Sequence, residues 1–277
     1  MAIQINRFGS AAVKVVLVTA ADRYNPAYYG SNANLRYCKT DAQKFLTYGP
    51  VSGDAQVIER YDNEITTASM LQDLTEIVTQ LKSGDTFVWY HSGHGTYQDV
   101  FTGPNKQERL TGRCMYEPGT GQTSPVLWDT MLIPIWQRVA GGVNIVTIND
   151  TCFSENNNRM VPNPQGEYMV ARFTQPKEPT LLTPYKGKLT MKRGSGILAL
   201  NACNFREVAY EVGHAQAQRA GGIFTEALVR SGEDGGAISL VFQKAKTKMP
   251  PLYPQTPVIE YIPKTGATNK RLKSLTL

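Results

Sequence analysis

The chain has 277 residues and a formal net charge of +6, and 41% of its residues are hydrophobic while 19% are charged. This composition excludes a disordered or fibrous chain and supplies enough apolar side chains for a globular core. No stretch approaches 18 uninterrupted apolar residues, and the first dozen residues lack the apolar run of a secretion signal. We therefore expect a cytoplasmic protein that makes no contact with a membrane.

Charge and cysteine content exclude further classes of function. Basic residues are scattered, and the two densest stretches, 186–193 and 264–273, predict exposed loops and a solvated tail, not a nucleic-acid-binding face. The four cysteines lie far apart without a Cys-x-x-Cys pair, which argues against a disulfide scaffold and a zinc site. The three histidines do not form a ligand cluster, so we expect no catalytic metal.

Short apolar runs alternate with amphipathic stretches along the chain. In chain order they predict a strand at 13–20, a helix at 39–48, a strand at 55–61, a helix at 66–82, a strand at 85–91, a helix at 124–139 that Pro134 kinks or breaks, strands at 143–148 and 197–202, helices at 224–230 and 238–246, and a strand at 258–262. Polar sequence rich in Gly or Pro predicts loops at 92–121 and 154–194.

Strands separated by helices imply an α/β fold with a mostly parallel central sheet of about six strands flanked by helices. In such sheets, ligands bind beyond the carboxyl ends of the strands. Two segments with reactive side chains occupy such ends: His-Ser-Gly-His-Gly closes the strand at 85–91, and Asn-Asp-Thr-Cys closes the strand at 143–148. We therefore expect His94 and Cys152 to lie at the same edge of the sheet.

His94 and Cys152 together predict a nucleophile and its acid/base partner. A thiol titrates near ~8.5 and an imidazole near ~6.5, so His94 can take the thiol proton and return it to a leaving amine. Gly95 and Cys152 can offer main-chain N–H groups to a developing oxyanion. Taken singly, His94 is also explained as a polar turn residue and Cys152 as an inert buried thiol.

The order and spacing of several short motifs resemble the metacaspases, which are caspase-like cysteine peptidases. Residues 90–95 are similar to the family's Tyr-Ser-Gly-His-Gly motif with His91 inserted, and residues 150–155 keep the Asp and Cys of its nucleophile motif. That second motif has Phe-Ser-Glu where the family has His-Ser-Gly. Further similarity lies at residues 35–42, 201–203, 222–225 and 255–257, with Glu211 near an acidic position of the family.

The resemblance implies a caspase-like three-layer sandwich in a single domain. Its parts would be a large-subunit-like half at 13–153, a linker loop at 154–194 and a small-subunit-like half at 195–262. It also implies a monomeric endopeptidase that cuts protein or peptide substrates after Arg or Lys, with an S1 pocket built from Cys38, Asp41, Ser92 and Asp150. Two carboxylates in a confined pocket do favour a cation. Asp41 is also explained as a helix-start charge, and Asp150 as the cap of a turn.

Metacaspases are often activated by calcium through acidic residues. Asp99 is similar to one such position, but Arg113 and Cys114 stand near the family's acidic pair, so we expect weak calcium dependence or none and no other cofactor. The linker loop offers sites at which an enzyme specific for basic residues could cut itself. These are Arg159, Arg172, Lys177, Lys186, Lys188, Lys192 and Arg193.

Three other interpretations remain open at this point. The Phe-Ser-Glu departure allows an inactive caspase-like domain used for binding or scaffolding. A different cysteine-dependent hydrolase or transferase on an α/β sheet would be indifferent to a basic substrate residue. A flavodoxin-like binding domain would need a phosphate-binding loop, and no such motif is present in the sequence.

Overall fold

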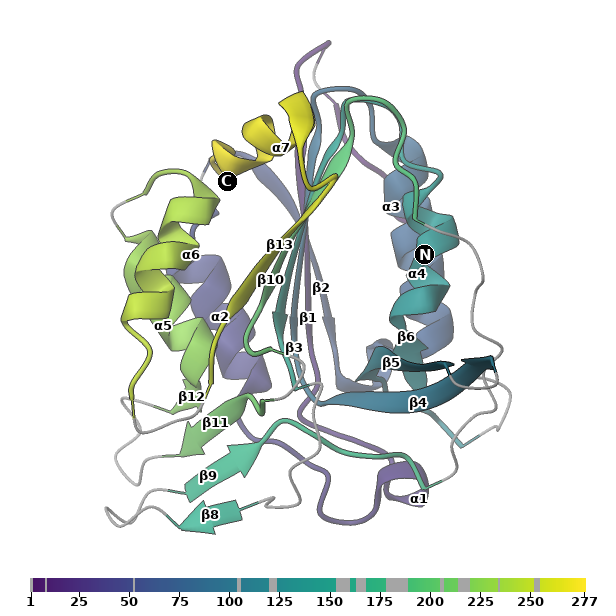
Figure 1. The fold of residues 1–277 in the computed structure, drawn as a ribbon, viewed down its shortest axis with the longest axis vertical. Helices are drawn as coiled ribbons and strands as arrows, with labels where there is room; N and C mark the ends of the chain where they lie inside the picture. Colours follow the sequence, from purple (N-terminus) through teal and green to yellow (C-terminus); the bar gives the residue numbers. More distant parts are fainter. Residues whose placement is uncertain are drawn as a thin grey trace.

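The computed structural model describes residues 2–7, 9–51, 53–103, 106–119, 124–152, 160–162, 168–177, 189–204, 207–213, 220–233, 235–251 and 255–277. A six-stranded sheet forms the centre of the molecule, with the strand order β13-β10-β7-β3-β1-β2 (Figure 1). All neighbours in it are parallel except β10 and β13, which are antiparallel. The strands are β1 (Lys14–Ala20), β2 (Ala55–Tyr61), β3 (Thr86–Ser92), β7 (Asn144–Asp150), β10 (Gly196–Asn201) and β13 (Val258–Ile262).

Helices cover both faces of this sheet, as Figure 1 shows. One face carries α2 (Cys38–Tyr48), α5 (Ile223–Gly232) and α6 (Ile238–Thr247), and the other carries α3 (Thr67–Gln80) and α4 (Asp129–Trp136). The short helices α1 (Pro26–Tyr29) and η1 (Asp62–Glu64) lie in connections. The predicted α/β sandwich with about six mostly parallel strands is confirmed.

Local sequence explains why the central elements form where they do. Strands β3 and β7 are buried along their whole length, as expected for strands covered by helices on both faces. Helix α3 begins after Thr66, whose hydroxyl accepts a hydrogen bond from the Ser69 N–H, and its apolar side chains recur at helical spacing.

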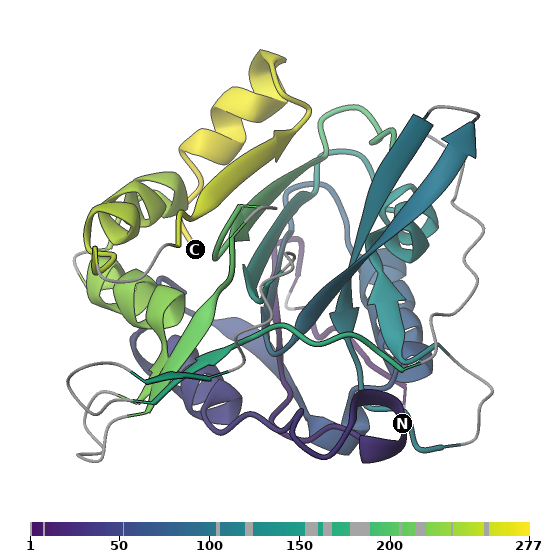
Figure 2. The same cartoon turned by 60° about the horizontal axis from the view of Figure 1, so that its bottom comes forward.

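Two small antiparallel sheets lie at the carboxyl end of the central sheet (Figure 2). The first contains β4 (Gly95–Gly103), β5 (Lys106–Cys114) and β6 (Val126–Trp128). The second, in the order β12-β11-β9-β8, contains β8 (Met160–Pro162), β9 (Tyr168–Ala171), β11 (Tyr210–Gly213) and β12 (Gly221–Gly222). These two sheets enclose the edge at which His94 and Cys152 are expected.

Several sequence-based predictions of local structure are wrong. The loops predicted at 92–121 and 154–194 contain the β4–β5 hairpin and strands β8 and β9, respectively. The helix predicted from residue 124 begins only at Asp129, because the residues before it extend as β6 beside β5. The missed strands are either mainly polar, as in β4 and β5, or only three or four residues long, as in β6, β8 and β9, and all of them pair with another segment.

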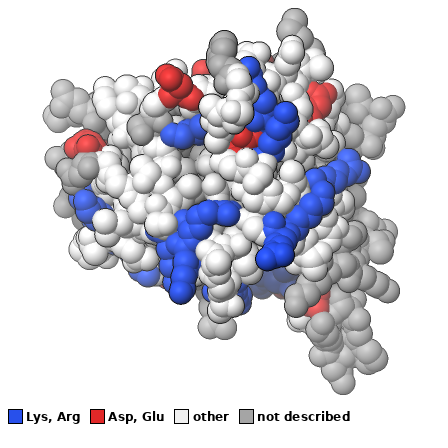
Figure 3. Space-filling view, turned by 90° about the horizontal axis from the view of Figure 1, so that it is seen from above, with Lys and Arg blue, Asp and Glu red and all other residues white. Residues whose placement is uncertain are grey.

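The predicted solvated tail is also wrong, because residues 266–273 form helix α7 (Gly266–Lys273). Leu272 of this helix is fully buried, and the Arg271 guanidinium donates to the Gly194 carbonyl and the Asn144 side chain. Helix α7 therefore contacts Gly194, which directly follows the 186–193 stretch in the sequence, at the end of the sheet opposite the small sheets. Figure 3 views the molecule from that end, where Lys and Arg side chains form separate groups among neutral residues.

Among the described residues, no helix combines the length and apolar character needed to span a bilayer.

Asp85 connects the start of β3 to the N-terminal segment. Its buried carboxylate accepts hydrogen bonds from the Arg7 guanidinium, the Val13 N–H and the Lys82 N–H. These bonds hold the pKa of Asp85 below its ordinary value although burial raises it. The ionised carboxylate thus ties together the residue before β1 and the loop after α3.

We expect Asp85→Ala to lower the free energy of unfolding by about 3 kcal/mol, because the substitution leaves two main-chain donors and a partly buried guanidinium without their acceptor. Denaturant unfolding measures this loss. Asp54→Ala, at an exposed position, is the matched control and is expected to change stability by less than about 0.5 kcal/mol. Equal stability of the two variants would contradict the role of Asp85.

Candidate active site

The parallel register of β3 and β7 brings the two reactive strand ends together. Ser92 pairs with Asp150 in this register, and His94 and Cys152 each lie two residues further along their own chain segment. Between them, Gly95 packs against the Cys152 main chain so closely that a Cβ atom at Gly95 would lie 1.7 Å from the Cys152 carbonyl oxygen. Only glycine permits this approach.

His94 is held by main-chain and aromatic contacts. Its Nε2 lies 2.7 Å from the Ala33 carbonyl oxygen, and its main-chain N–H donates to the Tyr24 hydroxyl at 2.7 Å. The Tyr24 and His94 rings pack with their centroids 4.8 Å apart. Because a carbonyl can only accept a hydrogen bond, the neutral ring carries its proton on Nε2, which makes Nδ1 the basic nitrogen.

The Cys152 thiol is fully buried beside Ala209. Its Sγ donates to the Ala209 carbonyl at 2.9 Å and accepts from the Ala209 N–H at 2.7 Å. Burial, together with the neighbouring Cys203 thiol, raises the pKa of Cys152 well above its ordinary value. The thiol is therefore protonated in this arrangement, and it needs a base before it can act as a nucleophile.

The N–H groups of Gly95 and Cys152 converge on one oxygen atom. Both donate to the Arg172 carbonyl, at 2.9 Å from Gly95 and 3.3 Å from Cys152. Two main-chain donors aimed at one carbonyl oxygen are the arrangement that stabilises an oxyanion during acyl transfer. The chain's own residue 172 thus occupies the position that the sequence assigned to a substrate carbonyl.

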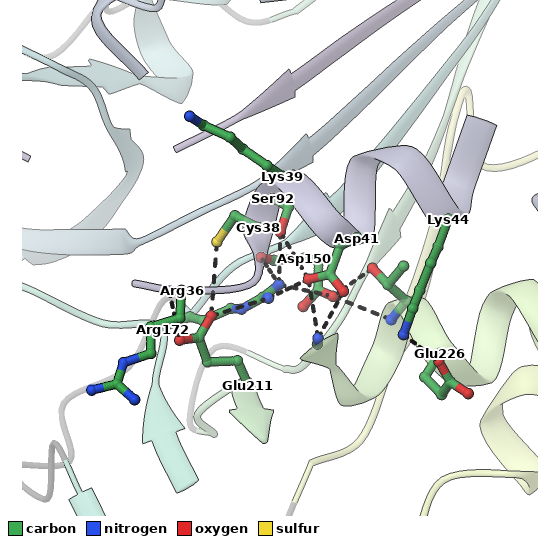
Figure 4. A network of polar contacts seen from close by, with 12 residues as sticks. Arg36, Cys38, Lys39, Asp41, Lys44, Ser92, Asp150, Arg172, Glu211 and Glu226 are labelled. Atoms are coloured by element: carbon green, nitrogen blue, oxygen red, sulfur yellow. Dashed lines mark hydrogen bonds and ion pairs between the residues drawn. The ribbon is translucent and has the colours of Figure 1, made fainter. Parts of the chain in front are cut away.

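The Arg172 side chain is fully buried in a pocket of carboxylates (Figure 4). Its Nη1 lies 3.0 Å from Asp150 Oδ2, and its Nη2 contacts the Asp41 carboxylate and lies 3.6 Å from Glu211 Oε2. Nη1 also donates to Ser92 Oγ at 2.8 Å. Burial alone would lower the pKa of Arg172, but the carboxylates hold it well above its ordinary value. The guanidinium is therefore charged.

The pocket carboxylates are themselves anchored by the start of helix α5. Asp41 accepts from the Gly222 N–H at 2.9 Å, and Asp150 accepts from the Thr225 N–H at 3.1 Å and the Thr225 hydroxyl at 2.6 Å. A Cβ at Gly222 would lie 2.2 Å from Asp150 Oδ2 and 2.6 Å from Arg172 Nη1. Glycine before this helix therefore makes room for the pocket, and the positive helix terminus favours the two anions.

Three of the four residues predicted for the basic-residue pocket, Asp41, Ser92 and Asp150, bond to the Arg172 guanidinium. The fourth, Cys38, lies at the side of the pocket, with its Sγ 4.0 Å from Glu211 Oε2. Sequence reasoning noted Glu211 only as near a family position and did not assign it to the pocket. In the structure its other oxygen accepts from the Arg36 N–H at 3.1 Å.

The segment around Arg172 crosses the site in an extended conformation. Strand β9 pairs antiparallel with β11, and the Arg172 N–H donates to the Ala209 carbonyl at 2.9 Å. Beyond Arg172, Phe173 forms an isolated parallel β-bridge with Gly95, and the Thr174 N–H donates to the Gly95 carbonyl at 3.2 Å. Addition of a strand to a sheet edge in this way is a common mode of peptide recognition.

His91 and Asp99 have structural partners. His91 is buried with its Nδ1 2.8 Å from the Thr19 hydroxyl, and burial lowers the pKa of its ring well below the ordinary value. Asp99 forms an ion pair with Arg109 on the β4–β5 hairpin. Among the residues that the structure describes, no cluster of His, Cys, Asp and Glu could hold a metal ion. His214 lies outside the described residues.

The pocket predicts a pH dependence of stability. Burial raises the pKa of Asp41 to about 6 and that of Glu211 to about 7, although the Arg172 guanidinium opposes both shifts. The folded protein therefore binds protons that the unfolded chain, with carboxyl pKa values near ~4, releases. This contribution to stability is complete below about pH 4 and is lost as the pH rises through about 6 and 7.

We expect the unfolding free energy of Cys152→Ala, relative to that of Cys152→Ala/Glu211→Gln, to rise on the order of 2 kcal/mol when the pH is lowered from about 8 to 5. His91, whose pKa is lowered by burial, contributes a pH dependence of stability with the opposite sign. Because His91 is present in both variants, its contribution cancels in the comparison. Glu226→Gln is the control. Partial burial raises the pKa of the Glu226 carboxyl, but Lys44 and Arg230 lower it by more, so this substitution should leave the pH dependence of stability between about 8 and 5 unchanged. Parallel pH profiles for the first pair would contradict the raised pKa of Glu211.

Comparison with known proteins gives evidence on the family and the fold of the chain. A family model described as the caspase domain matches residues 14–266. Among the solved structures, that of a Geobacter sulfurreducens protein is 17% identical, with a TM-score of 0.71 over 95% of this chain and 97% of that one, which supports the fold. No curated protein matches the chain significantly. Because the caspase-domain match spans most of the sequence, the chain belongs to the caspase-domain family of cysteine peptidases.

Proposed function

We propose that this protein is a cysteine endopeptidase that cuts peptide bonds after Arg or Lys. One observation carries the proposal: a single residue, Arg172, has its carbonyl on the Gly95 and Cys152 donors and its side chain among the pocket carboxylates. One basic residue in an extended backbone therefore occupies both the pair of main-chain donors and the carboxylate pocket, which are the two parts of the proposed substrate site. A substrate Arg bound in the same way would place its carbonyl carbon beside the thiol.

The proposed reaction assigns one role to each of these groups. His94 takes the thiol proton on Nδ1, and the Cys152 thiolate attacks the carbonyl carbon of the basic residue. The N–H groups of Gly95 and Cys152 stabilise the oxyanion, and the imidazolium of His94 then protonates the leaving amine. A water molecule, deprotonated by His94, hydrolyses the thioester and restores the thiol.

The charge of the pocket determines which residue precedes the cut. Asp41, Asp150 and Glu211 surround the guanidinium, and the Ser92 hydroxyl adds a neutral acceptor. Arg satisfies several acceptors at once through its planar fork, whereas Lys offers a single ammonium, so Arg is preferred over Lys. A substrate Asp would add a further buried carboxylate to this cluster and is rejected.

Arg172 is our candidate for the self-processing site among the basic residues described in the 154–194 segment, which also include the exposed Arg193. Arg172 fills the pocket, whereas the Lys177 ammonium donates to the Pro26 carbonyl, and Lys192 donates to the Arg138 carbonyl. Arg159, Lys186 and Lys188 lie outside the described residues. We therefore place the self-processing cut between Arg172 and Phe173.

Weak calcium dependence, or none, is part of the proposal. Each step above uses only protein groups and water. Asp99, the residue similar to a calcium ligand of the family, has its carboxylate bonded to Arg109 Nε at 2.9 Å and Nη2 at 3.1 Å. A calcium ion there would have to displace a two-bond ion pair. Activity is therefore expected to change little when a chelator is added.

Incubation of the wild-type chain is expected to produce a fragment whose N-terminal sequence begins with Phe173, and mass spectrometry of the products identifies the cut. Cys152→Ala should remain intact and lose reporter-peptide cleavage by at least about a thousandfold. Arg172→Lys should keep the cut, and Arg172→Gln should lose it because the pocket is left without a cation. Lys177→Gln, which alters the nearest other basic residue described in the segment, is the control and should be cut normally.

Reporter peptides that end in Arg, Lys or Asp test the specificity in the same preparations. We expect cleavage in the order Arg, then Lys, with none after Asp. A wild-type chain that cuts no reporter and stays intact would support the inactive binding or scaffold domain instead. Equal cleavage after Arg and Asp would contradict the role of the carboxylates.

A further inference from the structure

The chain remains bound to the protein after it passes the proposed cut. The Thr174 N–H donates to the Gly95 carbonyl at 3.2 Å, and the Lys177 N–H donates to the Tyr28 carbonyl at 2.7 Å. Figure 2 shows this segment running from β9 past the carboxyl ends of the central strands toward the region of α1. The side of the cleft that holds the leaving peptide is therefore built by β4 and by the residues around α1.

The first side chain on that side, Phe173, is bound by an aromatic neighbour. Its ring stacks on Tyr97 of β4, with the centroids 5.9 Å apart and the planes at 29°. Only 9% of Phe173 and 7% of Tyr97 are exposed. The offset stacked arrangement at this separation is a favourable geometry for two aromatic rings.

Tyr97 is itself fixed by a cation. The Arg109 guanidinium lies over the Tyr97 ring, with its Cζ 3.9 Å from the ring centroid. Arg109 is in turn held by the two hydrogen bonds to Asp99, across the paired strands β4 and β5. A ring supported in this way presents a fixed flat surface to the residue that follows the cut, and it does so at little conformational cost.

We propose that Tyr97, supported by Arg109 and Asp99, forms a subsite that binds a planar aromatic side chain directly after the cut. The inference rests on the proposed peptidase function and extends it to the substrate class: bonds between a basic residue and Phe, Tyr or Trp are preferred. An aliphatic side chain loses the ring stacking, alanine also loses the burial, and a Lys or Arg at this position meets the charge of Arg109.

The test uses the self-processed wild-type enzyme and quenched fluorescent peptides with the sequence Met-Val-Ala-Arg-X-Thr-Gln, which copies residues 169–175. With X as Phe, Leu, Ala or Lys, kcat/KM is expected to fall in that order. The ratio of Phe to Ala should be about tenfold, in line with one stacked and buried ring. The Phe to Leu ratio separates stacking from simple apolar burial.

Substitution of Tyr97 shows whether this ring is responsible. The Phe to Ala ratio should fall toward one in Tyr97→Ala and be retained in Tyr97→Phe, which keeps the ring and removes the hydroxyl. Tyr48→Ala changes a tyrosine that is 60% exposed at the end of α2, and it should leave the ratio as in the wild type. Because each ratio is taken within one enzyme, differences in folded fraction cancel.

A reporter with only Val-Ala-Arg before a coumarin leaving group distinguishes the possible failures. If wild-type enzyme cleaves this reporter but treats all four X peptides alike, the aromatic subsite is overturned while the proposed function stands. If Tyr97→Ala keeps the wild-type ratio, the preference exists but Tyr97 does not cause it, which also overturns the inference. Cleavage of neither kind of peptide would overturn both proposals.

Discussion

The charge balance around Arg172 is the constraint on which the architecture of the candidate active site depends. A guanidinium without exposure to water is strongly unfavourable unless its charge is compensated, and the same holds for the carboxylates of Asp41, Asp150 and Glu211. The guanidinium and the carboxylates are therefore stable in these buried positions only while their partners of opposite charge are present. Because the anions are fixed by main-chain donors at Gly222, Thr225 and Arg36, the pocket exists as a rigid anionic cavity that requires a cation.

This requirement links three parts of the fold that are remote in the sequence. Asp41 comes from helix α2, Asp150 from the end of β7, and Glu211 from β11, so the buried cation joins the central sheet, one helical layer and a small sheet. The same residue sets the register of β9 on β11 and places Phe173 against Tyr97. Cleavage after Arg172 would separate these contacts into two groups, because Phe173 would no longer be covalently joined to the buried cation.

The sequence was sufficient for the parts of the molecule that depend on local pattern. Apolar periodicity located the six central strands and most of the helices, and the rule that ligands bind at strand ends led to the expectation that His94 and Cys152 lie at the same edge of the sheet. The missed parts depend on contacts between distant segments. The Ala33 carbonyl beside His94 leaves no sequence signal, because every residue has a carbonyl. Arg172 was one of seven basic residues in the predicted loop, and its place among the carboxylates depends on the pairing of β9 with β11, which the sequence pattern does not reveal.

The main-chain contacts on both sides of Arg172 would restrict the form of any substrate of the proposed peptidase. Residues 168–174 of the chain pair with β11 before Arg172 and with Gly95 after it, and a substrate bound in the same way would have to be extended over this length. A helix uses its N–H and C=O groups for its own hydrogen bonds and cannot offer them to β11 and Gly95, whereas an exposed loop or an unfolded segment can. Under the proposed function, we therefore expect the main-chain contacts to select for backbone conformation first and the carboxylate pocket to select the basic residue within the extended segment.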